Sequence, residues 1–209
     1  MLLTPGPTPV PEFVRKAMSD ITIHHRTEEF EAIFKNTREL LLELYDMPEV
    51  VMLASSGTGA MEACVTNLTH KKALTINSGK FGERFGKICA AFGIDYTEIK
   101  NEWNTPVSVE AVVEAIKADS SIDAVFIQIC ESAGGLRHPV EQIAAEIKKI
   151  NKDITIVADG ITAVGVEKID TTNLDAVITG SQKALMLPPG LAMIGFSNAA
   201  VAKIESKPK

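Results

Sequence analysis

The chain contains few cysteines, few aromatic residues and no excess of positive charge. Its 209 residues include three cysteines, one tryptophan and two tyrosines, and the formal net charge is −6. Because the cysteines are odd in number and far apart (Cys64, Cys89 and Cys130), they suit neither a disulfide framework nor a metal site. We therefore expect reduced thiols in a cytoplasmic protein. A negative charge without a basic stripe is also unlike a nucleic-acid-binding protein.

Long apolar runs are missing as well. No stretch approaches the roughly 20 consecutive apolar residues that a membrane-spanning helix requires. The first residues lack the basic and apolar regions of a signal peptide, so we expect no membrane association. Apolar residues nevertheless make up 45% of the chain and charged residues 23%. This composition is typical of a globular protein and excludes disorder as the dominant state.

The N-terminal segment is rich in proline. Four of the first eleven residues are prolines, which favours an extended arm over a helix or a central strand. A short helix is expected over residues 12–18, so that the arm occupies residues 1–20. Apolar residues then recur with helical spacing from Glu28 to Tyr45, and Thr27 precedes them as the N-cap.

From about residue 49, short apolar segments alternate with helical ones. Strands are expected at 50–54, 73–77, 95–99, 124–130, 154–158, 176–179 and 192–196, and helices at 60–68, 80–92, 107–118 and 140–150. This alternation predicts an α/β fold of three layers, with a mostly parallel central sheet flanked by helices. We expect residues 21–209 to form one large domain.

Ligands of such sheets bind beyond the carboxyl ends of the strands. The chemically interesting residues fall in the five loops expected there. These loops are residues 55–59, 77–82, 131–136, 159–162 and 180–183.

Three features of these loops suggest chemistry, although each has an ordinary alternative. The glycine-rich turn around Ser56 and Thr58 suits an anion at a helix N-terminus, or is a plain capped turn. Asp159 ends an apolar strand, where it is an N-cap, a metal ligand or the partner of a protonated ring nitrogen. Lys183 lies among small and apolar residues, where it is a surface lysine or a desolvated amine suited to Schiff-base chemistry.

The three features together match the requirements of pyridoxal 5′-phosphate. This cofactor needs a lysine for the Schiff base, an acid that keeps the pyridine nitrogen protonated, and a cradle for the phosphate. Asp159 and Lys183 are 24 residues apart, which is enough for one passage between neighbouring strands.

The sequence resembles the class V aminotransferases of fold type I, in particular the alanine–glyoxylate and serine–glyoxylate (serine–pyruvate) group. The segments that carry the resemblance follow one another in the family's order over nearly the whole chain. They are TPGPTPVP at residues 4–11, HHRTEEF at 24–30, SGTGAME at 56–62, NSGKFGER at 77–84 and GSQKALMLPPG at 180–190.

The resemblance implies a role for each matching residue. Lys183 is expected to form the Schiff base and to move the proton between the substrate and the cofactor. Asp159 is expected to pair with the pyridine nitrogen. The phosphate is expected to be held by four residues, Ser56, Gly57, Thr58 and Gln182.

Four further positions follow from the same resemblance. Phe81 is expected to stack on one face of the pyridine ring and Ile161 to pack on the other. Ser132 is expected to form a hydrogen bond near the 3′-oxygen of the cofactor. Gly6, in the arm, is expected to lie near the substrate carboxylate.

The resemblance also implies the reaction and the assembly. The expected reaction moves an amino group between a small amino acid (alanine, serine or aspartate) and a 2-oxo acid (glyoxylate or pyruvate). The expected assembly is a homodimer. A lyase or desulfurase of the same class is an alternative, but desulfurases use a mobile cysteine from a later segment.

Two departures from the family pattern affect these expectations. The loop 131–135 has Ala133 and Gly134 where most relatives carry hydroxyl side chains. Family members are also close to twice as long, so the C-terminal small domain, with the arginine that binds the substrate carboxylate, is expected to be missing. The alternative function is therefore a catalytically impaired cofactor-binding domain or an interaction subunit.

Overall fold

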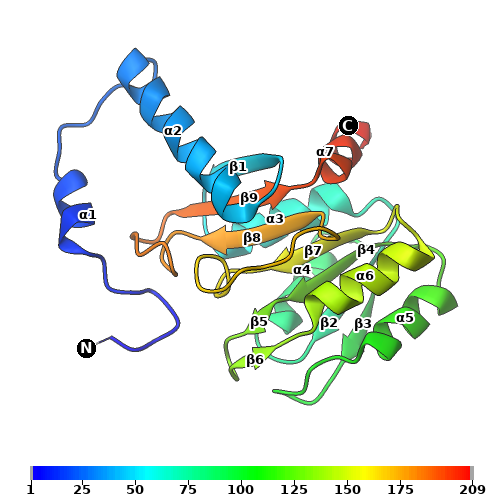
Figure 1. Cartoon of the computed structure of the whole chain (residues 1–209). Helices are drawn as coiled ribbons and strands as arrows, with labels where there is room; N and C mark the ends of the chain where they lie inside the picture. The colour runs from blue at the N-terminus through cyan, green and yellow to red at the C-terminus, as the bar shows by residue number, and fades with distance from the viewer. Residues whose placement is uncertain (1, 208–209) are drawn as a thin grey trace.

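One mixed sheet organises the molecule. The structure, a computed structural model, describes residues 2–207. The seven strands lie in the order β1-β9-β8-β7-β4-β2-β3 (Figure 1). Their bounds are β1 Glu49–Ala54, β2 Lys72–Asn77, β3 Tyr96–Lys100, β4 Ile122–Gln128, β7 Thr155–Asp159, β8 Ala176–Gly180 and β9 Leu191–Phe196. Strands β8, β7, β4, β2 and β3 run parallel, while β9 is antiparallel to both β8 and β1. The mostly parallel sheet is confirmed.

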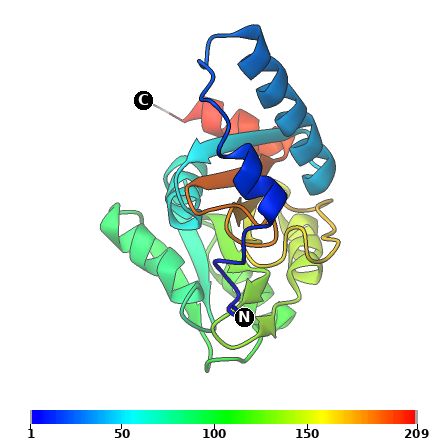
Figure 2. The ribbon, with the colours of Figure 1, turned by 90° about the vertical axis from the view of Figure 1, so that its left-hand side faces the viewer.

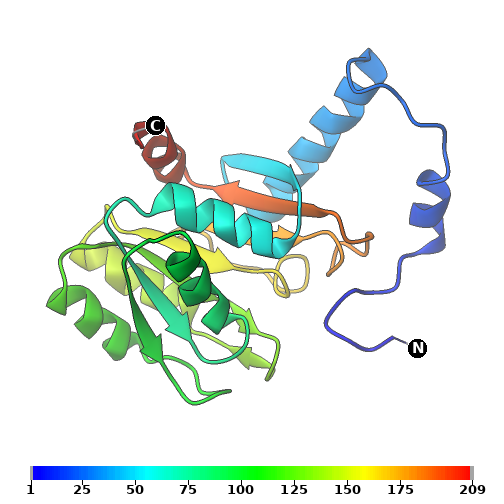
Figure 3. The same cartoon turned by 180° about the vertical axis from the view of Figure 1, so that it is seen from behind.

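Helices cover both faces of this sheet. They are α3 Gly57–Leu68, α4 Gly82–Ala91, α5 Val109–Ala118, α6 Val140–Ile150 and α7 Asn198–Ser206. Strand β4 shows how the layers arise, because successive side chains point to opposite faces. Val125 and Ile127 pack with α5 and α6, whereas Ala124 and Phe126 pack with α3, α4 and α7. Views from the two sides show these two helical layers (Figures 1 and 3). The three-layer α/β prediction is confirmed.

The sequence reading differs from the structure at two segments. The strand expected over 124–130 ends at Gln128, and a short hairpin follows, formed by β5 Cys130–Glu131 and β6 Leu136–Arg137. Helix α7 was not expected, although Ser197 is a good N-cap residue and its Oγ accepts a hydrogen bond from the Ala200 amide at 3.1 Å.

The N-terminal segment contacts the main body near Thr8, then runs outside it and returns at the C-terminal end of α2. It contains α1 Glu12–Ala17 and α2 Glu28–Tyr45, and Thr27 caps α2 as expected. Figure 2 shows the arm crossing in front of the sheet, and Figure 1 shows α2 projecting from it. The buried residues of α2 are Leu41 and Tyr45, near its C-terminal end. Among residues 2–207, no helix is both long enough and apolar enough to cross a membrane.

Candidate active site

The expected loops meet at one edge of the sheet. Strands β1, β2, β4, β7 and β8 all run in the same direction, so that their carboxyl ends share this edge. A small cavity there brings together five of the predicted residues, Phe81, Ser132, Asp159, Ile161 and Lys183, with two that the sequence did not suggest, Cys130 and Thr162. The fold thus brings together residues as far apart in the sequence as Phe81 and Lys183.

Asp159 is a buried acid at the end of β7, a central strand. It is 4% exposed, and its Oδ1 accepts a hydrogen bond from the Ile161 amide at 2.9 Å. Burial raises the pKa of Asp159 to about 6, partly opposed by this hydrogen bond and by the charge of Arg84. Because the pKa is raised in the folded state, the ionised carboxylate opposes folding above pH 6. This cost disappears as the pH falls towards the unfolded value of about 4.

Lys183 lies in the turn after β8, across the same cavity. Burial lowers the pKa of its amine, the charge of Asp159 opposes this effect, and the charge of Arg84 adds to it. A lowered pKa increases the fraction of neutral amine, which is the form that attacks a carbonyl group. The arrangement therefore places an activated amine and a buried acid in one site.

Phe81 is held by backbone contacts rather than by its own side chain. It occupies the N-cap position of α4, where it forms no side-chain cap hydrogen bond. Glu131 supplies the missing cap from β5: its Oε2 accepts from the amides of Phe81 at 2.9 Å and Gly82 at 2.8 Å. Gln128 donates to the Phe81 carbonyl oxygen at 3.1 Å. A fully buried carboxylate at a helix N-terminus thus fixes the aromatic residue of the site.

The predicted phosphate cradle lies at the N-terminus of α3. Ser56 caps this helix by accepting from the Gly59 amide at 3.4 Å. A side chain at Gly57 has no space, because its Cβ would lie 2.3 Å from Cδ1 of Ile161. Thr58 accepts a hydrogen bond from Arg84 Nη1 at 3.0 Å. The loop 55–59 therefore lies next to Ile161, the residue expected to pack on the cofactor ring.

The N-terminal arm reaches the site through two residues. The Thr8 amide donates to the Gln182 carbonyl oxygen at 2.9 Å, and its hydroxyl donates to the Lys183 carbonyl oxygen at 2.8 Å. Gly6 lies directly against the Lys183 side chain, since an added Cβ would be 2.8 Å from Nζ. Glycine at this position leaves room for the reactive amine.

The loop after β5 packs closely against Asn104. A Cβ at Gly134 would lie only 1.2 Å from Oδ1 of Asn104, so that any larger residue there requires the Asn104 side chain to move. Ser132, two positions earlier, lines the Lys183 cavity as expected.

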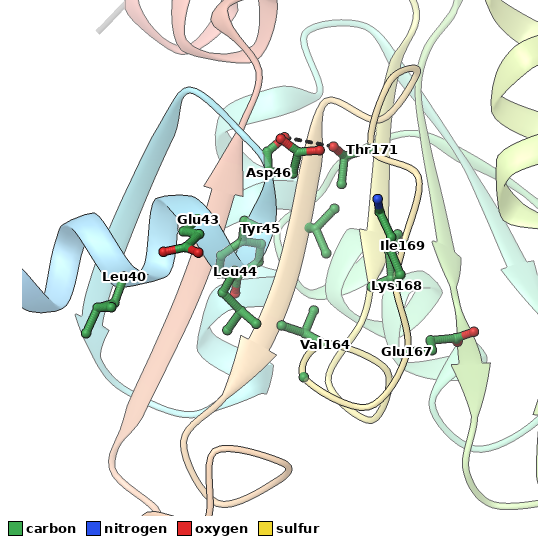
Figure 4. A pocket seen from close by; sticks show the side chains of 12 residues that line it. Leu40, Glu43, Leu44, Tyr45, Asp46, Val164, Glu167, Lys168, Ile169 and Thr171 are labelled. Carbon is green, nitrogen blue, oxygen red and sulfur yellow. Dashed lines mark hydrogen bonds between the residues drawn. The ribbon is translucent and has the colours of Figure 1, made fainter.

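A larger cavity, of about 570 Å³, lies between α2 and residues 164–171 (Figure 4). Its lining includes Leu40, Leu44 and Ile169, and it shares no lining residue with the Lys183 cavity. Two of its lining residues are joined by a hydrogen bond: Thr171 donates to the Asp46 carbonyl oxygen at 2.9 Å. This cavity is larger than the one at Lys183, but the reactive side chains lie in the smaller one.

Comparison with known proteins identifies the family. The profile described as Aminotransferase class-V matches residues 2–208. The chain belongs to the class-V aminotransferase family. Pyridoxal 5′-phosphate is the cofactor of this family, and the three-layer fold is shared with solved aminotransferases that depend on it.

Individual relatives agree with this assignment. An uncharacterized aminotransferase of Helicobacter pylori (strain J99) is 50% identical over 99% of this chain and 56% of the relative. The L-aspartate–glyoxylate aminotransferase of Paracoccus denitrificans is 30% identical over 98% of this chain and 54% of its own length. The crystal structure of an aspartate aminotransferase from Thermus thermophilus matches with a TM-score of 0.90 and 31% identity, covering 99% of this chain and 59% of that one. The chain spans about half the length of the curated relatives it matches.

The residues of this aminotransferase site fit the family cofactor. Asp159 is a buried acid that a protonated ring nitrogen would stabilise as the carboxylate. Within residues 2–207, the buried Oε1 of Gln182 has no hydrogen-bond partner, so it is free to accept from a bound group. Three contributors were missed by sequence reasoning: Arg84, Gln128 and Glu131 as a helix cap. Glu131 and Arg84 both lie in segments that the sequence had singled out, 131–136 and 77–84, but no pattern there indicated their contacts.

Replacing Glu131 by Gln tests the cap on α4. The substitution keeps the shape but removes the charge and replaces one acceptor oxygen by an NH2 group. Either the Ala133 amide, or the amides of Phe81 and Gly82 together, then lose their acceptor. We expect the free energy of unfolding to fall by about 2 kcal/mol, measured by chemical denaturation. Glu83→Gln, in the same first turn but paired with surface lysines, should change little. Equal stability of the Glu131→Gln variant and the unmodified chain would contradict this account.

Proposed function

We propose that this chain is the cofactor-binding part of a pyridoxal-phosphate-dependent aminotransferase. The observation that carries the proposal is the placement of Lys183 and the buried Asp159 around one cavity at the carboxyl edge of the sheet. Family membership supports the reaction class. Because the chain spans about half of its relatives, the substrates and the activity of the whole protein belong to this proposal.

The cofactor, when bound, supplies an electron sink for negative charge at the substrate α-carbon. Lys183 would hold the cofactor through its amine, and the same amine, when free, would accept the proton from the substrate α-carbon. Its lowered pKa suits this role, because the neutral amine is the proton acceptor. Asp159 holds the proton on the pyridine nitrogen, and the Phe81 ring orients the cofactor plane. Ser56, Gly57, Thr58 and Gln182 bind its phosphate, and Ser132 and Ile161 complete the contacts to the ring.

The proposed substrates are a small amino acid and a 2-oxo acid. Relatives named for L-aspartate–glyoxylate and serine–glyoxylate transfer support alanine, serine or aspartate as the donor and glyoxylate or pyruvate as the acceptor. The position of Gly6 beside the Lys183 amine supports its proposed place near the substrate carboxylate. A second candidate function is cofactor binding without turnover, since this chain spans about half the length of the relatives it matches.

The cysteines support a reducing compartment. Cys64 and Cys89 are buried, Cys130 is half-buried, and all three are free. Burial raises the pKa of Cys89 to about 11, so its unreactive thiol form dominates at neutral pH. We infer a cytoplasmic location on this ground. Cys130 lies in the short β5–β6 hairpin, which gives no support to a desulfurase that uses a mobile cysteine.

Replacing Lys183 by Ala tests the proposed function. The purified chain should develop a visible absorbance band with pyridoxal phosphate, and borohydride should fix one cofactor on Lys183, located by peptide mass. Lys183→Ala should abolish both signals, because Lys183 is the one lysine among the described residues that line the cavity. The matched control is Lys168→Ala, an exposed lysine outside the cavity, which should label like the unmodified chain. Unchanged labelling of Lys183→Ala would reject Lys183 as the reactive lysine.

A separate assay distinguishes the two candidate functions. Amino transfer from alanine, serine or aspartate to glyoxylate by this chain, abolished by Lys183→Ala, would establish an active transaminase. Cofactor labelling without turnover would establish the binding domain alone.

We also propose that the chain forms a homodimer. Apolar side chains of the N-terminal segment are solvent-exposed, including Leu3 at 84%, Phe13 at 73% and Ile21 at 93%. Ile33 and Phe34 of α2 are about half exposed. Apolar groups gathered on one projecting segment are typical of a protein–protein contact.

Sedimentation of the chain tests this assembly. We expect a dimer at micromolar concentration. Phe34→Asp should raise the dissociation constant of the dimer at least tenfold, because a charge would be buried in the contact. Phe92→Asp, an exposed aromatic outside this segment, is the control and should remain dimeric. A monomer over the whole concentration range would contradict the proposal.

A further inference from the structure

The proposed phosphate cradle has no charged member. Ser56 and Thr58 offer hydroxyls, Gly57 offers a backbone amide at the start of α3, and Gln182 offers a side-chain amide. A phosphate monoester carries about −1.5 to −2 charges at neutral pH. Moving such a charge out of water is costly unless a cation accompanies it. Hydroxyls and a helix N-terminus alone leave most of this charge uncompensated.

Arg84 is placed to supply the missing charge. It lies in the first turn of α4, and its Nη1 donates to the Thr58 hydroxyl at 3.0 Å. Its guanidinium carbon lies 4.9 Å from the centre of the Phe81 ring. Arg84 therefore touches one residue of the cradle and the residue expected to stack on the cofactor.

The positive charge of Arg84 is not neutralised by an acid of the described chain. Arg38 and Arg137, by contrast, form ion pairs with Glu49, Glu141 and Glu167. Across residues 2–207, no carboxylate forms an ion pair with Arg84. A half-buried guanidinium with a neutral hydroxyl as its side-chain partner retains donors for an anion.

The charge of Arg84 affects the pKa values of both Lys183 and Asp159. Burial is the main cause of the lowered Lys183 pKa, and the Arg84 charge adds to it. The same charge opposes the burial-driven rise in the Asp159 pKa. Arg84 thus acts on the two reactive groups from the side of the cradle.

We propose that Arg84 binds the phosphate group of the cofactor and supplies the positive charge that the cradle otherwise lacks. This inference rests on the proposed function and deepens it. Contact with Thr58 favours the phosphate over the substrate carboxylate as the anion, because Thr58 begins the helix on which the cradle is built.

The test compares pyridoxal phosphate with pyridoxal, which lacks the phosphate, as ligands of the full chain. Arg84→Gln should raise the dissociation constant of pyridoxal phosphate about ten- to hundredfold. The dissociation constant of pyridoxal should change less than about twofold. Arg84→Lys, which keeps the charge, should recover most of the loss. Lys87→Gln removes an exposed charge one turn along α4 and should affect neither ligand.

The possible outcomes separate this inference from the proposed function. If Arg84→Gln weakens the binding of both ligands equally, or of neither, Arg84 does not bind the phosphate. The proposed function would then still stand. Failure of the unmodified chain to bind either ligand would overturn the proposed function and the inference with it.

A second measurement needs no variant and holds if Arg84→Gln fails to fold. An arginine-specific dicarbonyl reagent should modify Arg84, as located by peptide mass. Pyridoxal phosphate should protect Arg84 at least tenfold better than pyridoxal at equal occupancy. Equal protection by the two ligands would overturn the inference.

Discussion

The site depends on the burial of one carboxylate at the end of a central strand. Asp159 closes β7, which lies between β4 and β8, and the walls of the cavity come from the loops that follow neighbouring strands. Burial makes the ionised form costly and raises the Asp159 pKa to about 6. In the unliganded chain this is a cost to stability. A cationic N–H partner would remove it, so that cofactor binding and folding are linked.

Two charged side chains near Asp159, Glu131 and Arg84, lie at the N-terminal end of α4. The first turn of α4 receives the buried Glu131 carboxylate, which leaves the first turn of α3 available for a different anion. Arg84 bridges the two helices through Thr58. Glu131 thus fixes Phe81, the residue expected to stack on the ring, and the N-terminus of α3, which Ser56 caps, forms the proposed cradle. Hydrogen bonds from Thr8 hold the arm against the turn that carries Lys183.

Much of the fold could be predicted from local patterns, whereas part of the site could not. The alternation of apolar strands and helices is local, and so is the Thr27 cap of α2. The placement of Asp159 and Lys183 followed from the rule for parallel strands. The cap from Glu131 to α4 joins residues 50 positions apart, and Arg84 reaches Thr58 across two helices, so no local signal marks either contact. The antiparallel direction of β9 likewise depends on sheet pairing.

The most direct test of this account is the ionisation of Asp159, followed by carbon NMR of labelled aspartate and assigned with Asp159→Asn. In the cofactor-free chain, this carboxyl group should titrate with a pKa near 6. Saturating pyridoxal phosphate should lower that pKa by about one unit or more, because a protonated ring nitrogen favours the carboxylate. An ordinary pKa near 4 in the free chain, or a value that the cofactor leaves unchanged, would contradict the account.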